Sequence, residues 1–183
     1  MKNVDRVMRA PMEDIRALTL LLHAKLESQA LSVLYMAIDR AAWVASSKEE
    51  INKNDFIAWT DKFLIANNDV NFSGLDLWAA RCGLLHTGAA ESRDYRKNGA
   101  NLIYYKVKAE MADEKVLSWL GDWLAELGVT PERVRFVDYF WLATELIEAF
   151  KRFQAWLDSE PELCEKAAAK ADRQISFQPL PRE

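Results

Sequence analysis

The sequence predicts an all-α fold, a bundle of five to seven helices formed by one domain that spans residues 1–183. Hydrophobic residues make up 50% of the chain, and seven Trp and eight Phe supply the bulk of a substantial core. Apolar residues recur every three or four positions through most of the chain, which is the spacing of one helix face. Capping residues, glycines and prolines stand where such helices would begin and end.

The first third of the chain predicts one long helix, or two helices with a break near Ser28. Pro11 is expected to open it, because proline suits the first helical position, and Asp14 would lie favourably in the first turn. From there to Ser46 the chain has neither Gly nor Pro. The second half of this stretch carries Asp39 among mostly apolar neighbours.

A polar loop then leads to a short helix over residues 55–64, for which Asn54 is the expected N-cap. Turn-forming residues follow, and Ser73 is expected to cap the next helix. Gly88 is expected to end that helix. The polar run after Gly88 predicts a loop, and residues 101–108 mix β-branched and aromatic side chains, which predicts a short strand or hairpin arm.

The C-terminal half predicts further helices within residues 112–173. The first is amphipathic and closes at Gly128. Thr130 and Pro131 predict a new helix start, and the helix that follows is expected to run to about Leu157. Pro161 separates it from a last helix, and residues 174–183 are expected to be an extended tail. The other part of the domain, about residues 12–108, contains the motif of Arg81 and His86 that is described below.

Several classes of protein are disfavoured by composition. Cys82 and Cys164 are too few and too far apart for a disulfide framework or a zinc cluster, so we expect no metal and no cofactor. The N-terminus carries no apolar run of signal-peptide length, and no run is long enough to span a bilayer. We therefore expect a soluble, cytoplasmic protein with no membrane partner.

Positive charge gathers in one place although the formal net charge is −4. Residues 81–108 carry six basic and two acidic side chains, whereas the parts before and after are both acidic. Arg93, Arg96 and Lys97 in this tract, with Tyr95 among them, could contact a phosphate backbone or single-stranded RNA. The alternative is a loop whose charges simply face water.

The segment LDLWAARCGLLHTGAAES, residues 75–92, holds the most informative pair, Arg81 and His86. No acidic residue lies three or four positions from Arg81, so its partner must come from another helix, another chain or a ligand phosphate. Asp39 could provide it through a buried salt bridge. His86 could equally be a helix-terminal histidine that interacts with the helix dipole.

This segment, together with the upstream IDRAAW and DFIAWTDKFL, resembles the HEPN superfamily (higher eukaryotes and prokaryotes nucleotide-binding), and more narrowly an uncharacterised bacterial group of HEPN-like proteins. The resemblance covers residues 28–108. It implies an all-α bundle that forms a homodimer and brings two Arg-His motifs together. Many members are metal-independent endoribonucleases, often in toxin–antitoxin or antiphage systems, and others are non-catalytic modules that bind a nucleotide or a protein, such as a cognate antitoxin.

Carried onto this chain, the resemblance makes Arg81 and His86 the catalytic pair. Imidazole titrates near neutrality and suits proton transfer, while a guanidinium suits phosphate binding. Five residues turn a helix by about 140°, so the two side chains converge within one chain only if the helix ends near His86. Asp39 could orient either of them, or lie on the surface beside Arg40.

Two further residues complete the candidate set. Cys82 follows the motif arginine, where nuclease members often carry Asn, His or Asp, and its two interpretations are a small core residue and a nucleophile. Glu91, just after the motif, could line the cleft.

Overall fold

The computed structural model describes residues 2–66, 68–88, 91–97, 99–106, 114–126 and 128–174. These residues form eight α-helices, of which α5 is a single turn, one π-helix, one 3₁₀ turn and a two-stranded sheet. The all-α prediction with a short β element is therefore confirmed. In chain order the elements are α1 (Asn3–His23), α2 (Glu27–Ala45), α3 (Lys53–Trp59), η1 (Thr60–Ile65), α4 (Gly74–Thr87), α5 (Arg93–Arg96), β1 (Leu102–Lys106), α6 (Glu114–Glu126), η3 (Pro131–Arg133), β2 (Val134–Asp138), α7 (Tyr139–Ser159) and α8 (Pro161–Ala171).

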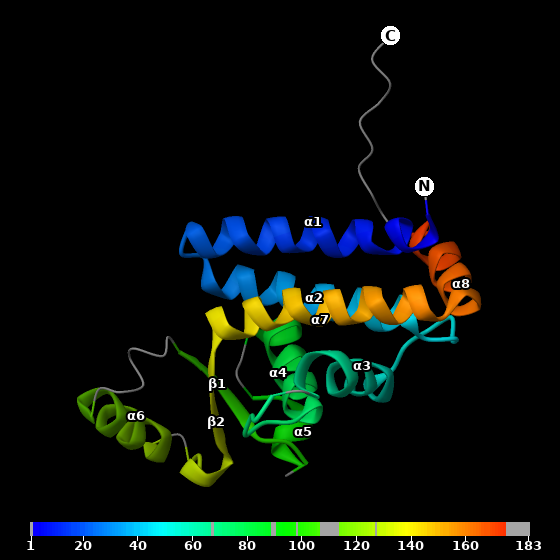
Figure 1. Ribbon diagram of the computed structural model, residues 1–183. Coiled ribbons are helices and arrows are strands. Elements are labelled where there is room, and N and C mark those ends of the chain that lie inside the picture. Colours follow the sequence, from blue (N-terminus) through cyan, green and yellow to red (C-terminus); the bar gives the residue numbers. More distant parts are fainter. Residues whose placement is uncertain are drawn as a thin grey trace.

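The main core lies between α1, α2 and α7, which run alongside one another, with α3 and α4 packed below them and α8 crossing one end (Figure 1). Fully buried residues of α2 and α7 fill its centre, among them Tyr35, Ile38 and Phe153. A smaller cluster joins α5, α6 and the two strands. Helices before and after the motif thus share one core.

The first helix begins earlier than the sequence predicted. Pro11 does not open it but lies buried inside α1, which starts at Asn3. Val4, Val7 and Met8 precede Pro11 at helical spacing and are buried, so the apolar stripe continues through a segment whose charges suggested a polar lead. The two-helix alternative for this part of the chain is confirmed, since residues 24–26 separate α1 from α2.

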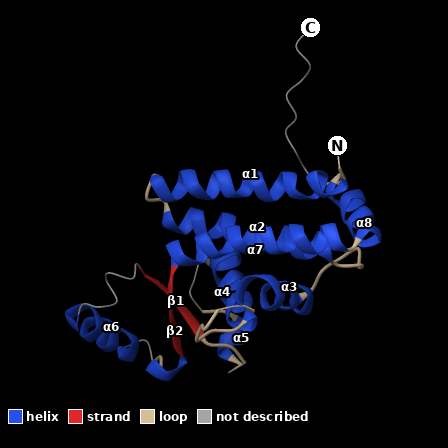
Figure 2. Cartoon of the chain, viewed as in Figure 1, coloured by secondary structure: helices blue, strands red, loops and turns tan. Residues whose placement is uncertain are grey.

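The second strand corrects another prediction. Thr130 and Pro131 begin only the 3₁₀ turn η3, and Val134–Asp138 is strand β2, which pairs in parallel with β1 from Leu102↔Val134 to Lys106↔Asp138. Two parallel strands need a crossover, and α6 lies in that connection (Figure 2). The long helix α7 begins after Asp138, whose side chain caps it by accepting from the Phe140 N–H at 2.8 Å.

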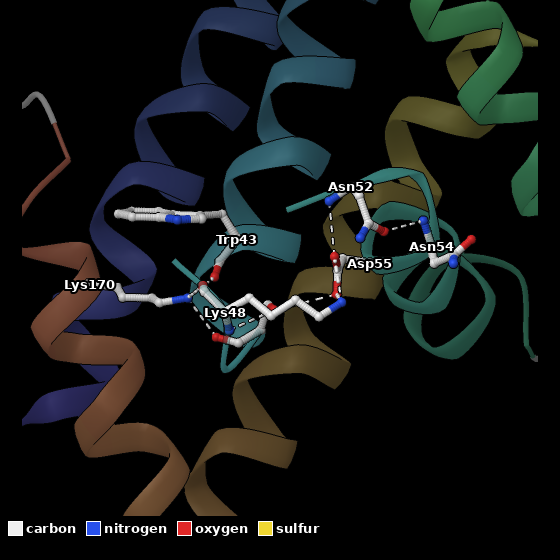
Figure 3. Close-up of polar contacts among 7 residues, drawn as sticks. Trp43, Lys48, Asn52, Asn54, Asp55 and Lys170 are labelled. Carbon is white, nitrogen blue, oxygen red and sulfur yellow. Dashed lines mark hydrogen bonds and ion pairs between the residues drawn. The ribbon is translucent and has the colours of Figure 1, made fainter. Parts of the chain in front are cut away.

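The side chain of Lys170 links the end of α8 to the end of α2. Its buried ammonium donates to the backbone oxygens of Trp43 at 2.9 Å and Ser46 at 2.6 Å, and also to that of Lys48 (Figure 3). These carbonyls lie at and just beyond the C-terminus of α2, where helix geometry leaves acceptors unpaired.

The N-cap of α3 differs from the prediction. The sequence predicted Asn54, whereas the structure has Asn52, whose side chain accepts from the Asn54 N–H at 2.9 Å.

A buried pair of tyrosine hydroxyls joins α2 to the sheet. The hydroxyls of Tyr35 and Tyr105 hydrogen-bond to each other, and burial raises the pKa of both groups, so both stay neutral. Tyr35→Phe or Tyr105→Phe should lower the free energy of unfolding by about 1–2 kcal/mol, because the remaining hydroxyl loses its partner. The double variant should lose no more than either single one. Urea denaturation of the three variants measures this, and additive losses would contradict it.

Candidate functional site

Helix α4 carries the Arg-His motif, and both of its ends are fixed as the sequence predicted. The Ser73 side chain caps the start by accepting from the Asp76 N–H at 3.3 Å, while Asp76 accepts from the Ser73 N–H at 2.9 Å. Asp76 also accepts from the Asn101 N–H at 2.6 Å, which joins the helix start to the strand. Gly88 ends the helix in the left-handed conformation at φ +66°.

The start of α4 lies directly against the π-helix η1. A Cβ at Gly74 would lie 2.5 Å from Asp61 Oδ1 and 2.6 Å from Thr60 Oγ1. A side chain at Gly74 would therefore force the Asp61 carboxylate and the Thr60 hydroxyl to move away. The absence of a side chain at Gly74 lets its N–H donate to Asp61 Oδ1 at 3.2 Å, which holds the start of α4 against η1.

The partner of Arg81 is Asp39 on α2. Arg81 donates to Asp39 Oδ2 from Nε at 2.9 Å and from Nη2 at 2.7 Å, and each side chain is 19% exposed. The other carboxylate oxygen, Oδ1, is buried without a hydrogen-bond partner. Of the partners that the sequence left open for Arg81, the structure selects another helix of the same chain.

Arg81 also contacts His86 within the same chain. Arg81 Nη1 lies 3.2 Å from His86 Nε2. Because a guanidinium carries only donors, Nε2 must be the acceptor and bear no proton in this contact. The helix ends one residue later, at Thr87, so His86 lies in its last turn and is exposed. This is the condition under which the two side chains were expected to converge.

Burial and charge act against each other in this cluster. Burial raises the pKa of the Asp39 carboxyl, and the hydrogen bonds and charge of Arg81 partly reverse that effect. For Arg81, burial disfavours the charged form, but hydrogen bonding and attraction to Asp39 outweigh it and raise the pKa of the guanidinium. Arg81 therefore remains a cation, and its positive charge is partly compensated before any ligand arrives.

Cys82 is half-buried next to this pair. Its Sγ lies 3.9 Å from Arg81 Nη1. Burial raises the pKa of the Cys82 thiol although Arg81 opposes the shift, so near neutral pH the sulfur is a protonated thiol. A protonated thiol is a poor nucleophile, which favours the interpretation of Cys82 as a small packing residue.

The basic residues after the motif lie beside α4, on the short helix α5 and at its C-cap. Arg93, Arg96 and Lys97 are exposed there, and Glu91 before them is half-buried. α5 packs against α4, and Asp94 is close enough to Cys82 to affect its titration.

Tyr95 has a different environment from its basic neighbours. It is buried in the smaller cluster, and the guanidinium carbon of Arg133 lies 4.2 Å from the centre of its ring. Arg133 also donates to the Tyr95 carbonyl oxygen at 2.8 Å. These contacts make Tyr95 a packing residue, so its ring is not presented for stacking on a base.

Two tryptophans near the motif were not singled out by sequence. The Arg81 guanidinium lies 5.1 Å from the Trp78 ring, and Trp43 lies one helical turn beyond Asp39 on α2. Both line a cavity of about 340 Å³ that Asp39 and Arg81 also line. The sequence contained a signal for both tryptophans. Trp43 is four residues from Asp39 and Trp78 is three residues from Arg81, and residues at these spacings are neighbours on a helix face.

Comparisons with known proteins found no similar protein. No family model, no curated protein and no solved structure matches this chain. Among the described residues, no group of three or more His, Cys, Asp or Glu side chains is placed to hold a metal ion. None of the helices in the described ranges has the length and apolar character needed to cross a bilayer.

Proposed function

We propose that this protein is a metal-independent endoribonuclease of the HEPN type that acts as a homodimer, with Arg81 and His86 as its catalytic residues. The observation that carries the proposal is the 3.2 Å contact between Arg81 Nη1 and His86 Nε2 at the exposed end of α4. A phosphate bound at Arg81 would lie beside the His86 imidazole, whose Nε2 carries no proton while it accepts from Arg81 Nη1.

The reaction needs a base, an acid and positive charge on the phosphate. The base removes the proton of the ribose 2′-hydroxyl, whose oxygen attacks phosphorus. The acid protonates the departing 5′-oxygen, so the products are a 2′,3′-cyclic phosphate and a 5′-hydroxyl. His86 suits the proton transfers, and Arg81 suits the charge that develops on the phosphate oxygens.

A second copy of the chain would supply the second proton-transfer group. Each chain brings one His86, and a dimer with two motifs in one cleft would let one imidazole act as base while the other acts as acid. The exposed side chains of Arg93, Arg96 and Lys97 beside α4 would attract the phosphate backbone towards this cleft.

A second candidate function is a non-catalytic helical module that binds a nucleotide or a partner protein, such as a cognate antitoxin. The observation in its favour is the salt bridge itself. Two of the three guanidinium nitrogens of Arg81 already donate to Asp39, which lowers the net charge available to a transition state. Binding without cleavage would support this alternative.

Single-stranded RNA incubated with the purified protein in excess EDTA tests the proposal. We expect that EDTA does not affect cleavage and that the products carry 2′,3′-cyclic phosphate ends. DNA of the same sequence should not be cleaved, because DNA lacks the attacking 2′-hydroxyl. Light scattering should give the mass of a dimer.

Three results would each contradict one part of this proposal. Intact RNA after prolonged incubation would leave the binding module as the better description. Products with 3′-hydroxyl ends would point to an attacking water instead of the ribose hydroxyl. A strictly monomeric protein that still cleaves would remove the second His86 from the mechanism.

A further inference from the structure

The cavity beside the salt bridge has the dimensions of a small-ligand site. Its volume of about 340 Å³ lies at the lower end of the range of roughly 300 to 1,000 Å³ that is typical of such sites. It lies where α2, α4 and the loop after α2 meet, and Ile51 contributes from that loop. A site of this size suits one planar ring system with a short polar extension.

Two indole rings line this cavity, and both are fixed by their surroundings. Trp43 donates from Nε1 to the Glu49 carbonyl oxygen at 2.8 Å, which fixes the orientation of its ring. Trp78 packs edge-on against Phe56 with ring centres 5.4 Å apart. Aromatic side chains that are already ordered lose little entropy on binding, and a nucleobase is a ligand that stacks on them.

Two arginines add positive charge to the same cavity. Arg40 and Arg81 both line it, and each is paired with an aspartate, Arg40 with Asp14 at 2.6 Å and Arg81 with Asp39. The Arg40 side chain remains 42% exposed. Cations beside aromatic walls fit a ligand that is planar at one end and anionic at the other, which describes a nucleotide better than an apolar molecule.

We propose that this cavity binds one unpaired nucleotide of a single-stranded RNA, with its base against Trp43 and Trp78 and its phosphate at Arg81. This inference rests on the proposed function and names the form of its substrate. Arg81 belongs to both parts, since it lines the cavity and contacts His86. A base that is paired in a duplex cannot leave its stack without an energetic cost, so duplex RNA is a poor substrate.

Calorimetric titration of the His86→Ala protein with small probes tests the cavity without turnover. We expect adenosine, guanosine, cytidine or uridine monophosphate to bind at least tenfold more tightly than ribose 5-phosphate, because only the nucleotides carry a base. Inorganic phosphate should bind no better than ribose 5-phosphate. Equal binding of all the probes, or no binding of any nucleotide, would overturn the proposal.

Substitutions at Trp43 locate the binding. Trp43→Leu should remove the preference for nucleotides over ribose 5-phosphate, a loss of about tenfold, whereas Trp43→Phe keeps an aromatic face and should retain most of it. Trp141→Leu is the matched control, because Trp141 is also half-buried but lines a different cavity. An equal loss in Trp43→Leu and Trp141→Leu would refute a specific role for Trp43.

An abasic substrate gives a test that needs no substitution in the protein. A short RNA with one abasic nucleotide next to the cleavage site should be cut at least tenfold more slowly than the intact RNA. Equal cleavage of the two would refute the base-binding cavity and leave the nuclease intact. Nucleotide binding that requires Trp43, found without any cleavage, would refute the nuclease and leave the cavity intact.

Discussion

Replacing His86 with alanine is expected to lower the rate of RNA cleavage by about 10²- to 10⁴-fold, the usual contribution of a positioned acid or base. The free energy of unfolding should hardly change, because His86 is exposed and its contact with Arg81 is a single hydrogen bond at the protein surface. Initial rates on one RNA substrate, together with thermal melting curves of both proteins, measure the two effects separately.

His23 provides the control for this substitution. It is the only other histidine of the chain, and like His86 it is exposed in the last turn of its helix. His23→Ala should leave the cleavage rate unchanged. If both variants cleave RNA at the wild-type rate, His86 is a helix-terminal histidine that interacts with the dipole of α4, as the sequence also allowed.

The motif helix was predictable because its signals are local. Ser73 and Gly88 mark its ends by short-range hydrogen bonding and by backbone conformation, and both act as expected. The convergence of Arg81 and His86 followed from the same local rule, since it required only that the helix stop near His86.

Strand β2 shows where local signals fail. Thr130 and Pro131 resemble a helix start, yet the Thr130 side chain makes no capping hydrogen bond and only one 3₁₀ turn follows. Val134–Asp138 becomes a strand because β1, some thirty residues earlier in the chain, offers it a parallel edge. A short apolar run is compatible with either structure, and a distant partner decides between them.

The environment of the candidate site depends on tertiary contacts in the same way. Asp39 as the partner of Arg81 was one of several alternatives, because charge patterns along one helix do not specify which other helix packs against it. Tyr95 was expected near the ligand on account of its basic neighbours, but Arg133 from a later segment covers its ring. The cavity between α2 and α4 also exists only in the assembled fold.

Replacing Asp39 with alanine is expected to lower the free energy of unfolding by about 2–3 kcal/mol. Removal of one partner leaves the other charge without compensation, and a fully buried pair loses about 3–5 kcal/mol in this way. The smaller value applies because Arg81 retains 19% exposure and can reach water. Cleavage should also fall, since the freed guanidinium no longer has a fixed position beside His86. Urea denaturation and initial rates measure the two losses.

The double variant Asp39→Leu with Arg81→Met separates stability from activity. Replacing both charges by apolar side chains of similar size removes the uncompensated cation, so stability should return to near the wild-type value. Cleavage should be lost in this double variant, because no guanidinium remains to bind phosphate. A stable double variant that still cleaves would show that the Asp39–Arg81 pair serves only the packing of α2 on α4. A stable double variant without cleavage would show that the arginine supports catalysis and that the aspartate holds it in place at a cost to its free positive charge.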